Sequence, residues 1–75
     1  MIVTARYFAV LRELRGTSSE AVDLPVGTTA AEAFAALFPG LPLRVAFAVN
    51  AATVASDTVL RAGDEIAFLP PLGGG

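Results

Sequence analysis

The residues best suited to chemistry in this sequence stand at its end, in the run Pro70-Pro71-Leu72-Gly73-Gly74-Gly75. The two prolines fix φ and favour a stiff, extended segment, whereas the glycines carry no Cβ and make the last stretch narrow. The run therefore presents the carboxylate of Gly75 on a thin arm, a shape that fits an active-site tunnel closed to bulkier side chains. A disordered terminus is the alternative interpretation.

The side chains that usually carry catalysis are absent or badly placed. The chain contains no Cys, no His and no Lys, which excludes thiol nucleophiles, thiolate metal sites, imidazole catalysis and Schiff bases at a side chain. Asp64 and Glu65 are adjacent at the start of an expected strand and face opposite ways, so they form no carboxylate pair. Asp57 is interpreted as the cap of a tight turn, and Ser18 and Ser19 have no His to activate them. We therefore expect no metal and no cofactor on this chain.

The terminal carboxylate can act only after activation. Its own leaving group is poor, but ATP converts it into an acyl-adenylate from which AMP departs, and a sulfur nucleophile can then produce a thiocarboxylate. The three final glycines have neither the spacing nor the following helix of a phosphate-binding loop. We therefore expect a separate enzyme to bind and use the ATP, and this chain to serve as a carrier.

Length and composition limit the remaining functions. The 75 residues allow one small domain. Apolar residues make up 55% of the chain, above the usual level of about 45–50%, which favours a tight core or an apolar surface kept for a partner. Five scattered Arg in a chain of net charge −2 make no basic face for nucleic acid. The sequence shows no membrane span and no signal peptide, so we expect the cytoplasm as its compartment.

Hydrophobic periodicity predicts five strands and two helices. The clearest helix begins at a capping box formed by Thr29 and Glu32, after which apolar residues recur at helical spacing. A shorter helix over 9–15 is expected to end at Gly16. The segment 57–60 resembles a single tight turn. Period-two alternation places the strands at 1–8, 20–24, 45–50, around 53–54 and at 65–69.

The main elements follow the order strand, strand, helix, strand, strand, strand. One amphipathic helix can cover only one face of such a sheet, which makes a two-layer α+β fold. The ubiquitin-like β-grasp has this order, with a mixed sheet whose first and last strands pair in parallel at the centre. We therefore predict a β-grasp domain over 1–69 and a flexible tail over 70–75 that leaves from the middle of the sheet.

The face of the sheet opposite the helix is expected to be partly apolar. If the central strands are parallel, Phe8, Ala67 and Leu69 lie near the exit of the tail. A contiguous apolar patch beside a functional tail indicates docking to a partner, with packing inside the fold as the alternative. The positions that alternate away from the expected core include Thr4, Arg6, Phe8, Ala46, Ala48, Glu65, Ala67 and Leu69.

The stretch 7–16, YFAVLRELRG, resembles the first strand and helix of the small, sulfur-carrying subunit of molybdopterin synthase, and the stretch 48–50 resembles the hairpin of that family. Residues 63–71, GDEIAFLPP, resemble its last strand and the Pro-Pro that precedes the tail. The resemblance covers nearly the whole chain.

The ending also resembles the family's Pro-Pro-Val-x-Gly-Gly, with Gly73 where a small polar residue is frequent. We therefore take Gly74 and Gly75 as the functional pair, with Gly75 adenylated and then converted to the thiocarboxylate. The resemblance implies that an enzyme similar to ubiquitin-activating enzymes adenylates this residue. It also implies that the large synthase subunit receives the tail and that sulfur passes to cyclic pyranopterin monophosphate to form the dithiolene of molybdopterin.

The expected docking contacts combine the apolar patch with the start of the tail. Leu69 stands where the family frequently has Phe, which changes the packing but keeps an apolar surface. Such a chain is not catalytic alone and donates sulfur as one subunit of a sulfurtransferase. The residues expected to bind the partner are Phe8, Ala67, Leu69, Pro70, Pro71, Leu72 and Gly73.

Three other functions stay open. A sulfur carrier for thiamin-thiazole synthesis or tRNA thiolation would share the fold, tail and activation, although the Phe-Ala-x-x-Arg-Glu stretch and Pro70-Pro71 favour molybdopterin. A protein modifier would use the same activated carboxyl to form isopeptide bonds on other proteins, but without Lys this chain cannot build lysine-linked polymers of itself. The third is a plain interaction domain whose tail is incidental.

Overall fold

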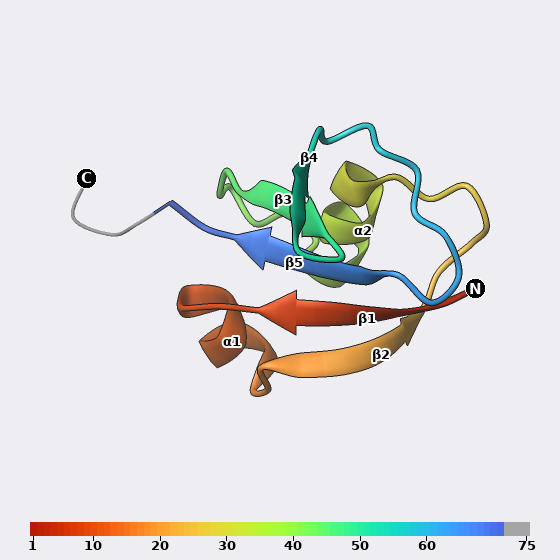
Figure 1. The fold of residues 1–75 in the computed structure, drawn as a ribbon. Coiled ribbons are helices and arrows are strands. Elements are labelled where there is room, and N and C mark those ends of the chain that lie inside the picture. Colours follow the sequence, from red (N-terminus) through yellow and green to blue (C-terminus); the bar gives the residue numbers. More distant parts are fainter. Residues whose placement is uncertain (72–75) are drawn as a thin grey trace.

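The computed structural model describes residues 1–71, which form a five-stranded sheet and two helices (Figure 1). In chain order the elements are β1 (Ile2–Tyr7), α1 (Val10–Arg15), β2 (Ser19–Asp23), α2 (Ala30–Leu37), β3 (Ala46–Val49), β4 (Ala52–Val54) and β5 (Glu65–Leu69). The predicted order of strands and helices is confirmed, with most ends within a residue of those expected. No helix in this part of the chain is long and apolar enough to cross a membrane.

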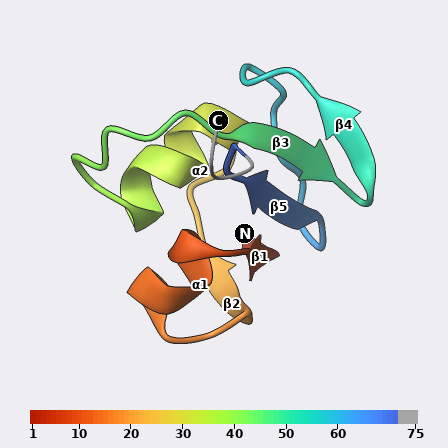
Figure 2. The ribbon, with the colours of Figure 1, turned by 90° about the vertical axis from the view of Figure 1, so that its left-hand side faces the viewer.

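The first and last strands of the chain lie side by side at the centre of the sheet, whose order is β2-β1-β5-β3-β4. β1 and β5 run parallel, with Thr4 opposite Glu65 and Tyr7 opposite Phe68, whereas the other three pairs are antiparallel. Figure 2 views the sheet from the end at which both central strands finish. The parallel central pair expected of a β-grasp is therefore confirmed.

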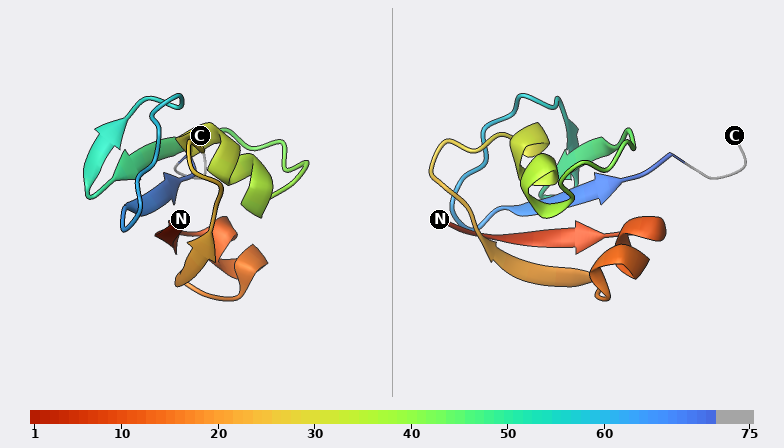
Figure 3. Two further views of the ribbon diagram at one scale, coloured as in Figure 1. Left: turned by 90° about the vertical axis from the view of Figure 1, so that its right-hand side faces the viewer. Right: turned by 180° about the vertical axis from the view of Figure 1, so that it is seen from behind.

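Both helices lie on one side of the sheet (Figure 2 and Figure 3). α2 packs across this face, and α1 lies beside the end of β1, where it leads into β2. Within residues 1–71 the opposite face carries no helix. The core therefore lies between the sheet and α2, and the second face presents its side chains outward.

The core is built from the strand residues that alternate toward α2. Val3, Ala5 and Tyr7 of β1 are each at most 1% exposed, as the alternation predicts. Edge-to-face and tilted ring contacts add to the stabilisation that burial itself provides. Phe68 of β5 lies at the centre of these rings, with its centroid 5.4–6.4 Å from those of Tyr7, Phe34, Phe38 and Phe47.

The ends of the helices follow the sequence signals. Thr29 Oγ1 accepts from the Glu32 N–H at 3.2 Å, and Glu32 Oε1 accepts from the Thr29 N–H at 2.9 Å, which completes the expected capping box. The bond from the Thr29 backbone holds the pKa of Glu32 below its ordinary value. α1 ends at Gly16, whose φ of 75° is left-handed and whose N–H donates to the Arg12 carbonyl at 2.8 Å.

The predicted position of the tight turn, at 57–60, is wrong. The turn lies earlier, because the Thr58 N–H donates to the Ala55 carbonyl at 3.1 Å. Val59 is then bridged to Thr29, and the Leu60 N–H donates to the Thr28 carbonyl at 2.9 Å. The backbone of this segment therefore pairs with the chain just before α2 instead of closing on itself.

Ala48 also differs from expectation, since it was assigned to the outward face and is only 8% exposed. The register does place it on that face, opposite Ala67 in β5 and Thr53 in β4. It is buried because β4 and β5 flank it on both sides, so its short side chain lies below the level of its neighbours. The middle of the outward face is thus more closely packed than the alternation of inward and outward strand residues predicts.

Candidate functional site

The candidate site lies at the end of the sheet where β1 and β5 both finish. Because these strands are parallel and Tyr7 stands opposite Phe68, the residues that follow them, Phe8 and Leu69, reach the same edge. An antiparallel pair would have placed these two residues at opposite ends of the sheet. The parallel register therefore brings together two predicted site residues that lie 61 positions apart in the sequence.

The chain leaves β5 at this edge through Pro70, which is half-buried, and Pro71, which is exposed (Figure 1). Both prolines lie after the last residue of β5 and so need no backbone N–H for the sheet. Leu72, Gly73, Gly74 and Gly75, to which the sequence assigns docking and chemistry, lie outside the described residues. Their roles stay predictions.

An exposed apolar surface adjoins this exit, and we define Phe8, Ala67 and Leu69 as the docking patch. Phe8 is 39% exposed and Leu69 is 36% exposed, whereas Ala67 is half-buried. Ala67 pairs with Arg6 and Leu69 with Ala46, so the patch lies on the face that carries no helix. The structure thus brings the three predicted patch residues together on one surface.

Two charged side chains border the docking patch. The Arg6 guanidinium carbon lies 5.8 Å from the centroid of the Phe8 ring. Arg6 Nη1 is also 3.6 Å from Glu65 Oε1, and both of these side chains are more than two-fifths exposed. A single exposed ion pair of this kind contributes little to stability. Its main consequence is that a partner covering Phe8 would also meet these two charges.

A set of hydrogen bonds fixes the start of β5 at the other end of the sheet. Asn50 Nδ2 donates to Asp64 Oδ1 at 3.1 Å, and Asn50 Oδ1 accepts from the Glu65 N–H at 3.0 Å. Asp64 Oδ2 accepts from the Arg61 N–H at 2.8 Å, which makes Asp64 a turn residue. These bonds join residues 48–50 to residues 63–71, two segments in which the sequence resembles the family. They also hold β5 in the register that brings Leu69 to the same edge as Phe8.

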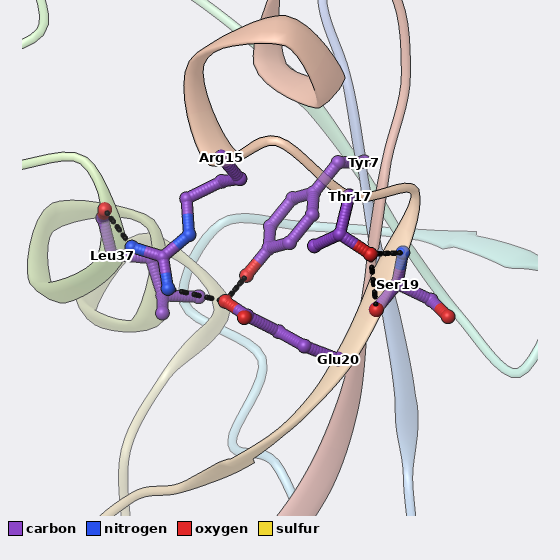
Figure 4. A network of polar contacts seen from close by, with 6 residues as sticks. All are labelled: Tyr7, Arg15, Thr17, Ser19, Glu20 and Leu37. Atoms are coloured by element: carbon purple, nitrogen blue, oxygen red, sulfur yellow. Dashed lines mark hydrogen bonds and ion pairs between the residues drawn. The ribbon is translucent and has the colours of Figure 1, made fainter.

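A polar network that the sequence did not reveal joins α1, β2 and α2 on the core side (Figure 4). The Tyr7 hydroxyl donates to Glu20 Oε1 at 2.7 Å, and Arg15 Nη2 donates to the same oxygen. Arg15 Nη1 also donates to the Leu37 carbonyl at 3.2 Å, at the end of α2. The Arg15 guanidinium lies 5.8 Å from the centroid of the Tyr7 ring. The network therefore ties α1 and β2 to the end of α2, on the side of the sheet opposite the docking patch.

The network shifts the pKa of each member in the direction that keeps it assembled. Burial, and then the bond to Glu20, raises the pKa of Tyr7 well above its usual range, so the hydroxyl stays protonated. The bond from Tyr7 lowers the pKa of Glu20, and the bond to Glu20 raises the pKa of Arg15. Because the charged carboxylate already has two donors, we interpret the network as structural support and not as an acid–base site.

Two further features lie outside the predicted site. Val10 and Leu14 of α1 are 42% and 57% exposed, and only Leu11 of this helix is buried.

No group of three or more His, Cys, Asp or Glu side chains that could hold a metal occurs within residues 1–71. An open hollow of about 350 Å³ lies between the loop after β2 and α2, lined by Leu24, Pro25, Val26, Gly27, Thr28, Glu32 and Ala36. It stands at the end of the sheet away from the docking patch, because β2 ends opposite the start of β1.

Comparison with known proteins gives one family. A model of the ThiS family matches residues 5–75, which is nearly the whole chain. The match includes both the sheet with its docking patch and the glycines that follow it.

Solved structures resemble the chain along its full length. Molybdopterin converting factor subunit 1 from Pyrococcus furiosus is 27% identical, with 96% of this chain and 99% of that chain covered and a TM-score of 0.79. SAMP1, small archaeal modifier protein 1, from Haloferax volcanii is 26% identical over all of both chains, with a TM-score of 0.78. A chain in the complex of subunits 1 and 2 of molybdopterin-converting factor from Helicobacter pylori is 26% identical over all of both chains, with a TM-score of 0.63. These likenesses agree with the predicted ubiquitin-like β-grasp.

Proposed function

The chain belongs to the ThiS family of ubiquitin-like sulfur carriers, and we propose that it is the sulfur-carrying small subunit of a molybdopterin synthase. The observation that carries this proposal is the position of the docking patch. Phe8 and Leu69 stay exposed at the end of the sheet from which the chain leaves β5 toward its glycines. A partner that receives the tail must cover this end, and the likeness to the Helicobacter pylori complex supports a second subunit as that partner.

The first chemical step is activation of the tail by a separate adenylating enzyme, for which ATP is a substrate. A carboxylate oxygen of Gly75 attacks the α-phosphate of ATP, and pyrophosphate leaves. A sulfur nucleophile then attacks the carbonyl carbon, and AMP leaves. When the nucleophile is hydrosulfide, its proton is lost and Gly75 carries a thiocarboxylate; when it is a persulfide, a thiol must reduce the acyl disulfide first formed, which releases the thiocarboxylate. The oxygen that departs with AMP is the atom that sulfur replaces.

The second step is delivery of the sulfur inside the large subunit. The thiocarboxylate sulfur forms a bond to a carbon of cyclic pyranopterin monophosphate, and an oxygen substituent leaves that carbon. Water then attacks the carbonyl carbon of the resulting thioester and breaks its C–S bond, which leaves the sulfur on the pterin and restores the carboxylate of Gly75. A dithiolene contains two sulfur atoms, so each product consumes two loaded carriers. The carrier itself is unchanged at the end of the cycle and returns to the activating enzyme.

The contribution of this chain is reach and docking. Six residues from Pro70 to Gly75 can extend at most about 20 Å. Without Cys, His or Lys, the chain offers no strong side-chain nucleophile to compete for the activated carbonyl. Both properties suit a carrier that must deliver one terminal atom to two different active sites.

A second candidate function is protein modification, which the likeness to small archaeal modifier protein 1 favours. In that reaction a lysine amine of another protein attacks the activated carbonyl of Gly75, AMP leaves, and an isopeptide bond forms. The two functions share their first step and differ only in the nucleophile. Tryptic peptides in which a lysine carries residues 62–75, the segment that trypsin leaves after Arg61, would reveal this second use.

The proposed function is tested by dithiolene formation in a mixture of the purified large subunit, cyclic pyranopterin monophosphate and thiocarboxylated protein. Deleting Gly75 or adding one residue after it moves the reacting carbon by about 3.3–3.6 Å, and a misplacement of about 1 Å can already cost on the order of a hundredfold in rate. Both variants are thus expected to abolish sulfur transfer, and Gly74→Phe to do nearly the same by blocking a narrow channel. The protein before thiocarboxylation serves as the negative control.

Thermal unfolding of these variants is expected to match that of the wild type, because the changes lie after β5. Full turnover by the protein that lacks Gly75 would overturn the proposed function. Dithiolene formation by the wild type combined with its loss in the three variants would support it.

A further inference from the structure

The backbone of Ala9 has a conformation that alanine rarely adopts. Its φ is 51° and its ψ is −127°, close to the values of the first central residue in a type II′ turn, where glycine is the usual residue. The turn is closed by the Leu11 N–H, which donates to the Phe8 carbonyl at 3.1 Å. Because only glycine adopts this region freely, the backbone at Ala9 is strained.

The side chain of Ala9 does nothing within the described fold that offsets this strain. It is exposed, so it adds no burial to the core. Ala9 also stands at the N-cap of α1, where alanine is a poor residue because it has no side-chain oxygen for the free N–H groups of the first turn. The strained conformation must therefore be held by the segments on either side of Ala9.

The two sides of Ala9 differ in how firmly they are held. On one side Tyr7 is 1% exposed, and its N–H donates to the Ser18 carbonyl at 2.8 Å. On the other side α1 has six residues, whereas an isolated helix is marginal below about 12–15 residues. Only Leu11 of α1 is buried. The helix therefore needs a further attachment to stay against the domain.

Arg15, the last residue of α1, provides that attachment (Figure 4). Its Nη1 donates to the Leu37 carbonyl at 3.2 Å, and its Nη2 donates to Glu20 Oε1. These bonds fasten the end of α1 to α2 and β2. The helix is thus strained at its start and fastened at its end.

We propose that α1 is a strained clasp, a helix that Leu11 and Arg15 hold closed against the strain at Ala9. The structure contains the closed state. When the contacts of Arg15 break, α1 detaches from the domain and Ala9 returns to an ordinary backbone conformation. Local opening of this kind takes place in segments with few buried contacts, and α1 buries one side chain.

The clasp couples the polar network to the docking patch on the other side of the sheet. Phe8 belongs to the same turn as Ala9, since its carbonyl accepts the Leu11 N–H. Opening of α1 breaks this bond and frees the backbone after Tyr7, so Phe8 is no longer fixed at the edge that it shares with Leu69. Closure of α1 is thus what holds Phe8 in the docking patch. Because the clasp lies wholly within the domain, it does not depend on which partner receives the tail.

Native-state hydrogen exchange tests the clasp at the amides of Glu13 and Gly16, which donate to the carbonyls of Ala9 and Arg12. After correction for intrinsic rates, these amides of the wild type are expected to exchange at least about a hundredfold faster than those of β5, because α1 opens without global unfolding. Their rates should rise little at low urea concentration, since a local opening exposes little surface.

Two variants act on the clasp in opposite directions. Arg15→Met removes the guanidinium but keeps a similar helix propensity, and it should speed the exchange of the α1 amides about tenfold. Ala9→Gly removes the strain and should slow this exchange about three- to tenfold, even though glycine also gains freedom in the open state. The double variant should lie between the two.

Ala51→Gly is the matched control. Ala51 is also an exposed alanine with a positive φ, 69°, and it stands in the two-residue turn between β3 and β4. This turn stays intact when α1 opens. Ala51→Gly should therefore slow the exchange of the β5 amides, which requires global unfolding, and leave that of the α1 amides unchanged. Ala9→Gly should slow exchange in both places.

Chymotrypsin tests the release of Phe8, because cleavage between Phe8 and Ala9 requires an extended backbone there. The rate of this cleavage follows the population of the open state when opening and closing are faster than cleavage. Arg15→Met should raise the rate by the same factor as the exchange of the α1 amides. Ala51→Gly should leave it unchanged.

The inference would be overturned if the α1 amides of the wild type exchanged as slowly as those of β5, or if Ala9→Gly left their exchange unchanged. An equal slowing of the α1 amides by Ala51→Gly would also overturn it. Unchanged cleavage after Phe8 in Arg15→Met would show that Phe8 is not released with α1. These measurements use the domain alone, so a negative result would leave the proposed function standing.

Discussion

Replacing Leu69 or Phe8 by Asp is expected to weaken binding to the large subunit by more than a hundredfold, and the exposure of these side chains sets the size of the effect. Each retains a little over a third of its surface in the free domain. Fully burying such a side chain stabilises by about 1.5–3 kcal/mol, so docking of the exposed third contributes about 0.5–1 kcal/mol per residue. Truncation to Ala should therefore lower affinity only about two- to fivefold.

An Asp at either position adds a larger penalty. The carboxylate would be taken out of water, and the guanidinium of Arg6 beside Phe8 is already paired with Glu65, so the cost is several kcal/mol after relaxation. With the lost apolar contact, the total reaches at least about 3 kcal/mol, or more than a hundredfold in affinity. The difference in affinity between the Ala and Asp variants shows whether water is excluded from the interface, because a hydrated contact would tolerate the charge.

Calorimetric titration of the large subunit with each variant measures these affinities, and urea denaturation shows whether the fold is retained. Ile2→Asp is the matched control. Ile2 alternates onto the same outward face of β1, is 54% exposed and lies at the far end of the strand. It should bind like the wild type. Unchanged affinity of Leu69→Asp and Phe8→Asp, or an equal loss in Ile2→Asp, would refute the assignment of the docking patch.

Three further predictions concern the fold that supports the site. Phe34→Ala should destabilise the domain by roughly 3–5 kcal/mol in chemical denaturation, because Phe34 is 9% exposed and packs against Phe68; a loss below about 1 kcal/mol would place it outside the core. Glu20→Gln should make the free energy of unfolding less sensitive to acid below about pH 4.3, the ordinary pKa of Glu. The folded carboxylate has a lowered pKa, so it stabilises the domain above the unfolded pKa and loses this contribution as the pH falls through the folded pKa; an equal loss of stability in variant and wild type would contradict it. Asn50→Ala should cost about 1–3 kcal/mol by removing two hydrogen bonds at the start of β5, and thermal unfolding that matches the wild type would disprove that role.

Much of the fold can be predicted from short-range patterns in the sequence. The inward positions of β1, the capping box at Thr29 and the stop at Gly16 each depend on residues within one strand or helical turn. The parallel pairing of β1 and β5 was expected because the β-grasp fold, which has this order of elements, pairs its first and last strands in parallel. The same alternation that identifies the core identifies Phe8 and Leu69 as outward residues, so the docking patch was accessible to sequence reasoning.

The features that sequence patterns missed depend on contacts between elements. Arg15 and Glu20 are five residues apart across a turn, and no local rule shows that both meet the hydroxyl of Tyr7. The acceptor at Leu37 is a backbone carbonyl, which leaves no trace in the sequence. The pairing of Val59 with Thr29 likewise replaces a turn by a bridge between distant segments.

The central claim is that Gly75 carries sulfur, and the mass of the protein tests it most directly. The chain is incubated with its activating enzyme, ATP and a sulfur donor, and the intact mass and the terminal peptide are measured. We predict a gain equal to the exchange of one oxygen atom for sulfur, confined to the peptide that contains Gly75 and absent without ATP. An unchanged mass under these conditions, or sulfur found at any other position, would contradict the account.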